Sequence, residues 1–176
     1  MKGSKKNSRQ TKLLLVLVRH GKATPKNVGL TDFERILTRK GHLESESIAD
    51  KIRKKIPPID LMISSPADRA LETAHVFARK LGYPIQKIRI AEMIYFADSI
   101  QPPVAYLQHL GNVGSTVALF GHNPMFDELA AYWLPGFSKT IPKSAALGIE
   151  FGTDAWADIS KNNGNLQFFL SPVKHG

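Results

Sequence analysis

Apolar runs and amphipathic stretches alternate along this chain of 176 residues. Residues 13–18 form a continuous run of leucine and valine that ends in a charged pair and a glycine, the pattern of a strand buried on both faces. Shorter apolar runs bounded by turn residues predict five further strands. These strands are expected over residues 59–64, 88–91, 116–120, 145–151 and 166–170.

Segments with helical periodicity separate the strands. Thr38 is a suitable N-cap for a helix over residues 39–56, in which isoleucines recur at helical spacing and which two prolines end. An apolar stripe predicts a second helix over residues 66–81, with Gly82 just past its C-terminus. Shorter helices are predicted over residues 102–110 and 126–134.

Strands that alternate with helices predict an α/β fold, here a three-layer α/β/α sandwich with a mainly parallel central sheet. The last two strands are joined by a polar loop with no room for a crossover helix, so at least one edge of the sheet is expected to be antiparallel. Residues 22–37 show no clear period and predict a long surface loop. Arg35 in this loop either contacts phosphate or is a surface charge, and we leave it out of the candidate site.

The formal net charge of +9 is concentrated at the N-terminus. Residues 1–12 hold five Lys and Arg and no acid, which leaves 19 basic against 15 acidic residues in the rest of the chain. We therefore expect a basic flexible tail over residues 1–12 and a single domain over residues 13–173. A nucleic-acid-binding arm is the alternative for the tail, but no nucleic-acid partner is expected.

Two further observations concern the environment of the protein. The apolar run at residues 13–18 is too short for a secretory signal or a membrane span, so no membrane partner is expected. The chain has no cysteine, which excludes a disulfide framework, a thiolate zinc site, an iron–sulfur cluster and a cysteine nucleophile. Both observations favour a cytoplasmic protein.

Histidine-containing turns follow two of the predicted core strands. Arg19 and His20 come directly after the first apolar run, and His122 follows the run at residues 116–120. Parallel neighbours would bring both imidazoles to one edge of the sheet, together with Arg69 from the turn after a third strand. Arginine forks and the N–H groups at a helix N-terminus both suit phosphoryl oxygens. The sequence therefore predicts a site for a phosphoryl dianion.

The surroundings of His20 indicate its chemistry. Nearby guanidinium charges disfavour imidazolium, so the pKa of His20 should be lowered and a neutral nitrogen should be available to attack phosphorus. A general acid and a passive donor are the alternatives. A metal site also competes, but two histidines beside two arginines, with no matched carboxylate pair, are electrostatically poor ligands. No metal and no cofactor is expected.

Four motifs in order resemble the histidine phosphatase superfamily, and more closely its small SixA-type phosphohistidine phosphatase branch. These motifs are Leu17-Val18-Arg19-His20-Gly21-Lys22, Ser64-Ser65-Pro66-Ala67-Asp68-Arg69-Ala70, Thr73-Ala74 and Gly121-His122-Asn123-Pro124. The resemblance covers roughly residues 13–172 and implies a phosphoglycerate mutase-like fold. It implies that His20 is the nucleophile, that Arg19, Arg69 and His122 bind phosphoryl oxygens, and that neither a metal nor an organic cofactor takes part.

Departures from the superfamily pattern bear on the substrate. Asn123 stands where one large branch has Asp, so an acid for the leaving group is missing at that position. A phosphoramidate N–P bond needs a proton much less than an alkoxide does, which favours phosphohistidine over phosphoserine or sugar phosphates. Glu92 follows the strand predicted at residues 88–91, where other branches place an acid, and is the candidate proton donor. Its alternative is a solvated charge at a strand end.

Three functional hypotheses result. The first is a metal-independent phosphatase that acts on phosphohistidine in a protein, through a covalent intermediate at His20. The second is a phosphomonoesterase for small phosphorylated metabolites, which would need Glu92 or a substrate group as its acid. The third is a non-catalytic phosphate-binding or protein-interaction module that keeps the pocket.

Overall fold

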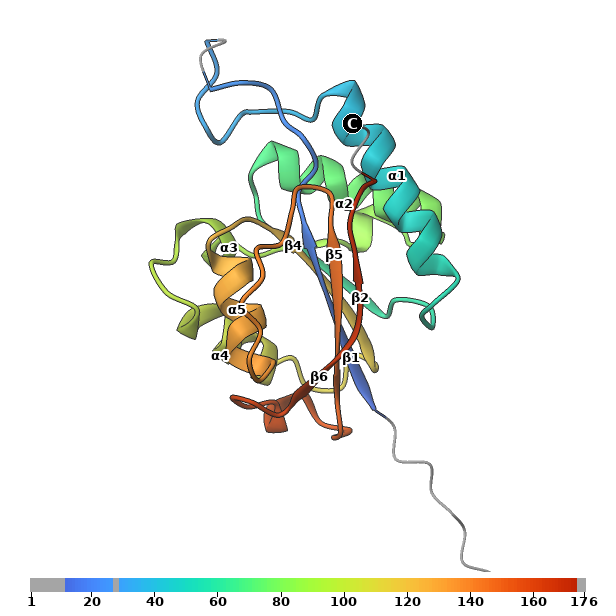
Figure 1. Cartoon of the computed structure of the whole chain (residues 1–176), viewed down its shortest axis with the longest axis vertical. Coiled ribbons are helices and arrows are strands. Elements are labelled where there is room, and N and C mark those ends of the chain that lie inside the picture. The colour runs from blue at the N-terminus through green and yellow to red at the C-terminus, as the bar shows by residue number, and fades with distance from the viewer. Residues whose placement is uncertain (1–11, 27–28, 174–176) are drawn as a thin grey trace, which may run out of the picture.

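The computed structural model describes residues 12–26 and 29–173 (Figure 1). Its six strands form one sheet. They are β1 Leu13–Arg19, β2 Leu61–Ser64, β3 Arg89–Ile90, β4 Thr116–Gly121, β5 Ala146–Phe151 and β6 Gly164–Leu170. The helices are α1 Arg39–Arg53, α2 Asp68–Leu81, α3 Met93–Phe96, α4 Gln101–Gln108 and α5 Met125–Trp133, with short 3₁₀ turns at Ile85–Lys87 and Trp156–Asp158.

The sheet has the spatial order β3-β2-β4-β1-β5-β6. β1, β2, β3 and β4 run parallel to one another, whereas β5 is antiparallel to β1 and β6 is antiparallel to β5. The prediction of a mainly parallel sheet with an antiparallel edge is therefore confirmed. In the pairing of β1 with β4, Arg19 lies opposite Gly121, so the residues that follow both strands emerge at the same edge.

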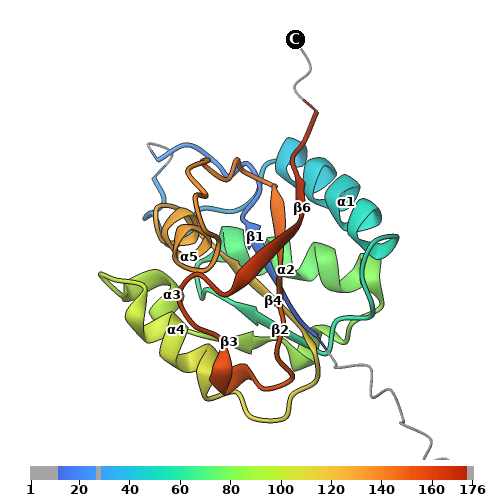
Figure 2. The same cartoon turned by 60° about the horizontal axis from the view of Figure 1, so that its bottom comes forward.

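Helices cover both faces of the sheet, as the three-layer prediction requires (Figure 1). Leu15 and Leu17 of β1 pack into a cluster with residues of α4 and α5, while Val16 and Val18 pack into a second cluster with residues of α1 and α2. This alternation follows from the two-residue period of a strand. Figure 2 shows α1 across the sheet from α4. β1 is thus buried on both faces.

The ends of two helices differ from prediction. α1 stops at Arg53 instead of residue 56, because the N–H of Lys55 turns back to the carbonyl of Ile52, three residues earlier, and so breaks the four-residue spacing of α-helical hydrogen bonds. α2 begins at Asp68 instead of Pro66, because Ala67 keeps an extended backbone. The predicted caps are confirmed: the Thr38 side chain accepts from Gly41 N, and Gly82 adopts the left-handed conformation at φ 71°. α3, a single turn, gave no periodic signal.

The segment predicted as a surface loop is partly buried. Ala23 and Leu37 form an isolated antiparallel bridge, which folds the segment back on itself. Arg35 is only 9% exposed, so the alternative that it is a surface charge is wrong. Its guanidinium is held inside the segment by the carbonyl of Thr24, at 2.7 Å from Nε.

Most of the predicted basic tail lies outside the described residues. Lys12, the last residue of that tail, is exposed and pairs with Glu150 at 2.6 Å. In residues 12–26 and 29–173, no helix combines the length and apolarity needed to cross a lipid bilayer. The cytoplasmic location stays a prediction.

The first turn of α1 holds the chain that follows His20. The backbone N–H and the hydroxyl of Thr38 both donate to the carbonyl of Lys22, at 2.8 and 3.0 Å. One turn later, Gly41 lies so close that an added Cβ would overlap the backbone oxygen and nitrogen of Lys22. Only glycine allows this approach, so α1 sets the position of the turn that carries His20.

We expect Gly41→Ala to destabilise the protein by about 1–3 kcal/mol, because the new methyl must push α1 away from the backbone of Lys22. Urea unfolding measures the change in the free energy of unfolding. Gly152→Ala is the matched control, since a Cβ there meets no atom within 4 Å. Equal stability of the two variants would contradict the tight approach of α1.

Candidate active site

His20 and His122 occupy equivalent places at the ends of two parallel strands. The N–H of His20 donates to the carbonyl of Gly121 at 3.0 Å, which ties one turn to the other. Their ring centroids lie 5.1 Å apart, and the two side chains are only 6% and 9% exposed. The sequence-based expectation that the sheet brings these imidazoles together is met by the geometry.

The hydrogen bonds of His20 define its tautomer. Nδ1 lies 2.7 Å from the carbonyl oxygen of Gly21, which can only accept, so Nδ1 carries the proton. Nε2 then presents its lone pair, and Arg69 Nε donates to it at 3.3 Å. His20 is thus positioned as a neutral imidazole with Nε2 facing the site.

Burial is the main cause of the neutral state of His20. It lowers the pKa of His20 to about 3, and the nearby charges of Arg69, Arg19 and Lys143 lower it further, against the opposing hydrogen bond to Gly21. The predicted direction is therefore confirmed, but the expected cause, repulsion by guanidinium groups, comes second to desolvation.

Arg69 projects from the first turn of α2 into the buried space beside His20. One turn further along, the hydroxyl of Thr73 donates to the carbonyl of Arg69 at 2.7 Å and accepts from the N–H of Gly21 at 3.1 Å. This hydroxyl fixes the helix against the His20 turn. The N-terminal N–H groups of α2 are used internally, since Asp68 N donates to the carbonyl of Phe33. Their expected contribution to anion binding is therefore reduced.

His122 is held through one ring nitrogen. Nε2 lies 2.7 Å from the hydroxyl of Ser65, which accepts from Ala67 N at 3.3 Å and can donate its own proton to Nε2, leaving the ring proton on Nδ1. Nδ1 is buried and has no hydrogen-bond partner in the described part of the chain. Burial, followed by the proximity of His20 and Arg69, lowers the pKa of His122 to about 2. His122 is therefore neutral, with one nitrogen available to a ligand.

Arg19 ends β1 and is half-buried at the edge of the site. Its Nη1 donates to the carbonyl of Ile141 at 2.7 Å, whereas its buried Nε has no partner in residues 12–26 and 29–173. Burial lowers its pKa, and the charge of Asp127 opposes that effect. An unused buried N–H on a guanidinium suits an anionic ligand.

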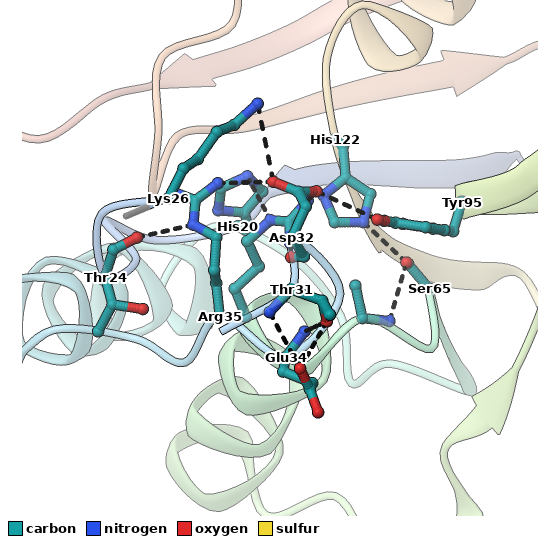
Figure 3. Close-up of polar contacts among 12 residues, drawn as sticks. His20, Thr24, Lys26, Thr31, Asp32, Glu34, Arg35, Ser65, Tyr95 and His122 are labelled. Carbon is teal, nitrogen blue, oxygen red and sulfur yellow. Dashed lines mark hydrogen bonds and ion pairs between the residues drawn. The ribbon is translucent and has the colours of Figure 1, made fainter. Parts of the chain in front are cut away.

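Asp32 is a residue of this site that the sequence analysis did not select (Figure 3). Its Oδ2 accepts from Arg69 Nη2 at 2.9 Å and from the hydroxyl of Tyr95 at 3.1 Å, and its Oδ1 accepts from Arg35 Nη1 at 2.8 Å. Burial raises the pKa of this carboxyl, but the two arginines and Tyr95 together lower it to about 2. The sequence feature that could have identified Asp32 was its spacing of three residues from Arg35 within a long polar loop.

Tyr95, in the short helix α3, was also missed. Its ring lies edge-on to His122 with centroids 5.5 Å apart, and Arg69 Cζ lies 5.9 Å from the ring centre. Burial, followed by its bond to Asp32, raises the pKa of the phenol. Tyr95 thus joins the loop carboxylate to both the imidazole and the guanidinium.

A cavity of about 380 Å³ opens beside these groups. Asp32, Arg69, Tyr95 and His122 line it next to Ile94, Asn123 and Pro124, and a second set of lining residues comes from α5 and from the segment after α3. That second set comprises Ala97, Asp98, Ser99, Met125 and Glu128. The first set brings cationic and hydrogen-bonding groups to the cavity, and the second set surrounds the space beside them.

Glu92 is exposed and does not line this cavity. Its backbone carbonyl accepts from Tyr95 N and Phe96 N, which begins α3. Its role as proton donor stays a prediction. Asn123 is tied away from acid chemistry, since its Nδ2 donates to Asp127 at 2.8 Å. In the described ranges, no group of three or more His, Asp or Glu side chains could hold a metal ion.

This geometry agrees with comparisons to known proteins. The family model of the histidine phosphatase superfamily (branch 1) matches residues 15–95. A protein histidine phosphatase SixA solved with tungstate is 25% identical, with a TM-score of 0.77 over 91% of this chain and 97% of that one. SixA of Agrobacterium tumefaciens is 27% identical, with a TM-score of 0.72 over 91% and 98% of the two chains.

Residues 15–95 therefore match the pattern of the histidine phosphatase superfamily, as the motifs predicted. The similarity to the two SixA structures over nearly the whole chain agrees with the predicted SixA-type branch. A curated relative, serine/threonine-protein phosphatase Pgam5, mitochondrial, of Drosophila virilis, is 24% identical over 171 residues. That match covers 90% of this chain, but the chain spans only 58% of the length of that relative.

The low pKa of His20 predicts a specific dependence of stability on pH. Between pH 7 and pH 5 this histidine, with an ordinary pKa of about 6.5, takes up a proton in the unfolded chain but not in the folded protein. Stability therefore falls with falling pH, by about 2 kcal/mol from His20 alone. We expect His20→Asn to lose about 2 kcal/mol less than wild type over that range.

Urea unfolding at both pH values measures this difference. His109→Asn serves as the control, because the His109 side chain is exposed to solvent in the folded protein. A loss of stability in His20→Asn as large as in wild type would show that folded His20 takes up the proton after all.

Proposed function

We propose that this chain is a metal-independent phosphatase that removes the phosphoryl group from phosphohistidine in a protein, through a covalent intermediate on His20. The observation that carries the proposal is the state of His20: a buried, neutral imidazole with Nδ1 bonded to Gly21 and Nε2 facing Arg69 at 3.3 Å. A module that only bound phosphate would have no need of an uncharged nucleophile at that place.

In the first step, Nε2 of His20 attacks phosphorus. A new N–P bond forms as the N–P bond of the substrate breaks, and the electron pair of that bond returns to the leaving imidazole, which takes one proton from solvent. We assign Arg69 Nε, Arg19 Nε and His122 Nδ1 as donors to the three phosphoryl oxygens, since the last two have no partner of their own in the described residues. Donors aimed at developing charge lower the barrier.

In the second step, water attacks the phosphorus of phosphorylated His20. The N–P bond breaks, its electron pair returns to Nε2, and inorganic phosphate leaves, so one water is consumed in each cycle. The hydrogen bond from Nδ1 to Gly21 keeps the same tautomer through both steps, so Nε2 is restored as a lone-pair donor. Every step uses protein groups, water and substrate alone.

The surroundings of the leaving group support a phosphoramidate substrate. The Asn123 amide is not an acid, and Asp32, the carboxyl bonded to Arg69, stays ionised because the two arginines and Tyr95 lower its pKa to about 2. An alkoxide leaving group needs general acid catalysis, whereas an imidazole leaves with less help. The site therefore fits the chemistry of an N–P bond better than that of an ester.

The rim of the cavity supports a substrate larger than a metabolite. Phe96 is 62% exposed and stacks on Phe33 with ring centroids 6.3 Å apart, and both rings contact Tyr95, which lines the cavity. Exposed aromatic groups beside a binding site are typical of protein contacts. The aromatic rim therefore favours a phosphorylated protein over a free sugar phosphate.

The principal test is hydrolysis of a phosphohistidine peptide in the presence of EDTA. We expect wild type to release phosphate and His20→Ala to lose more than about 1,000-fold in kcat, because the attacking nitrogen is gone. A phosphoserine peptide and a simple alkyl phosphate are assayed alongside. Faster cleavage of either ester would mean that the substrate is wrong although the enzyme class stands. Cleavage of none of them would favour the phosphate-binding module.

Glu92→Gln separates the phosphohistidine phosphatase from a small-metabolite phosphomonoesterase. We expect kcat/KM for the phosphohistidine peptide to change by less than about threefold, since an imidazole leaves without strong acid catalysis. A loss of about 100-fold confined to the alkyl phosphate would assign Glu92 to ester cleavage only. A collapse on both substrates would contradict the proposed chemistry.

A further inference from the structure

The guanidinium of Arg69 is held by an acid from a distant loop. Asp32 contacts it twice: its backbone carbonyl accepts from Nη1, and its carboxylate Oδ2 accepts from Nη2 at 2.9 Å. Arg69 is buried and Asp32 is 37 residues away in sequence, so the contact is a tertiary one. It lies within the site but plays no part in the two chemical steps described above.

We propose that Asp32 is a positioning residue that fixes which edge of the Arg69 guanidinium faces the phosphoryl group. The proposal rests on the proposed function, because it concerns the anion site of the same reaction. A guanidinium has five N–H donors in one plane, divided between an end formed by Nη1 and Nη2 and a side formed by Nε and Nη2. Asp32 occupies the end and leaves the side to face His20.

The orientation matters because the side edge is a fork. Nε and the second N–H of Nη2 point in the same direction, and Nε already lies 3.3 Å from Nε2 of His20. A phosphoryl group entering at His20 would therefore meet two parallel donors, the arrangement in which arginine binds phosphate most specifically. Rotation of the guanidinium would turn this pair of donors away from His20.

Asp32 is itself held in place by neighbouring side chains, so it can orient the guanidinium of Arg69. Arg35 donates to Oδ1 at 2.8 Å, and Arg35 is fixed in turn by the carbonyl of Thr24. The hydroxyl of Tyr95 donates to Oδ2 at 3.1 Å, and Lys26 Nζ lies 3.9 Å from Oδ1 (Figure 3). The carboxylate is thus fixed from the loop on one side and from α3 on the other.

Charge and geometry predict opposite effects for the loss of Asp32. A carboxylate next to an anion site repels the anion, so its removal should tighten phosphate binding if only charge matters. If Asp32 orients Arg69, its removal should weaken binding, because the freed side chain must be ordered each time an anion binds. The sign of the change in affinity therefore separates the two roles.

The test measures binding of inorganic phosphate by isothermal titration calorimetry to wild type, Asp32→Ala and Asp32→Asn. We expect the Kd of Asp32→Ala to rise at least tenfold, and that of Asp32→Asn to rise less, because an amide oxygen can still accept from one arginine. Asp98→Ala is the matched control, since Asp98 lines the same cavity but makes no hydrogen bond or ion pair with any described residue. We expect it to bind phosphate at least as tightly as wild type.

A kinetic measurement distinguishes positioning from general loss of structure. With the phosphohistidine peptide, Asp32→Asn should lower kcat more than it raises KM, because Arg69 is needed most as charge moves onto the phosphoryl oxygens. Tyr95→Phe, which removes one bond to Asp32, should fall between wild type and Asp32→Asn in phosphate affinity. Melting temperatures show whether each variant is folded; if Asp32→Ala is not, Asp32→Asn and Tyr95→Phe decide.

The positioning role would be overturned if Asp32→Asn bound phosphate as tightly as wild type or more tightly, and Asp98→Ala changed in the same direction. Asp32 would then affect phosphate only through its negative charge. Failure of wild type to bind phosphate would overturn the proposed function together with this inference. Phosphate binding without hydrolysis of any substrate would contradict the proposed function only, because the affinity measurement needs no turnover.

Discussion

The pairing of β1 with β4 is the constraint on which the site depends. Because the strands are parallel and Arg19 lies opposite Gly121, the next residues of both chains, His20 and His122, reach the same edge with their rings 5.1 Å apart. A slip of one residue would turn the side chains of β1 to the opposite faces of the sheet. Two hydrophobic clusters, one on each face, oppose such a slip. Ordinary core packing therefore fixes the geometry of the site.

Burial has opposite consequences for the two imidazoles and for the guanidinium of Arg69. The imidazoles respond by losing protons, since their pKa values are lowered to about 3 and 2, and so they cost little to bury. The guanidinium of Arg69 cannot do so and needs a counter-ion, which Asp32 supplies at 2.9 Å. The result is a neutral imidazole beside a fixed positive charge. In the proposed function that charge attracts the phosphoryl group, and His20 does not have to release a proton before it attacks phosphorus.

Likeness to the superfamily and choice of substrate depend on different parts of the chain. The strand ends and the first turn of α2 carry the motifs that resemble the superfamily, and in the proposed function these bind and transfer a phosphoryl group whatever it is attached to. Five further residues of the cavity come from α5 and from the segment after α3, outside the four motifs. In the proposed function, contacts made there and at the neighbouring exposed ring of Phe96 distinguish a protein substrate from a metabolite.

The sequence alone determined the order of strands and helices along the chain and the α/β class, because periodicity and turn residues are local signals. It also determined the four motif residues His20, His122, Arg19 and Arg69. It further indicated that His20 is neutral, although the cause inferred from sequence, repulsion by nearby guanidinium groups, lowers the pKa less than burial does. Asp32, Arg35 and Tyr95 were not selected, since a polar residue in an aperiodic loop has the same pattern whether it faces solvent or a buried guanidinium. Only the folding of residues 29–37 over α2 places Asp32 on Arg69 and buries Arg35. That contact spans 37 residues and joins two oppositely charged groups, and it was decided by tertiary packing.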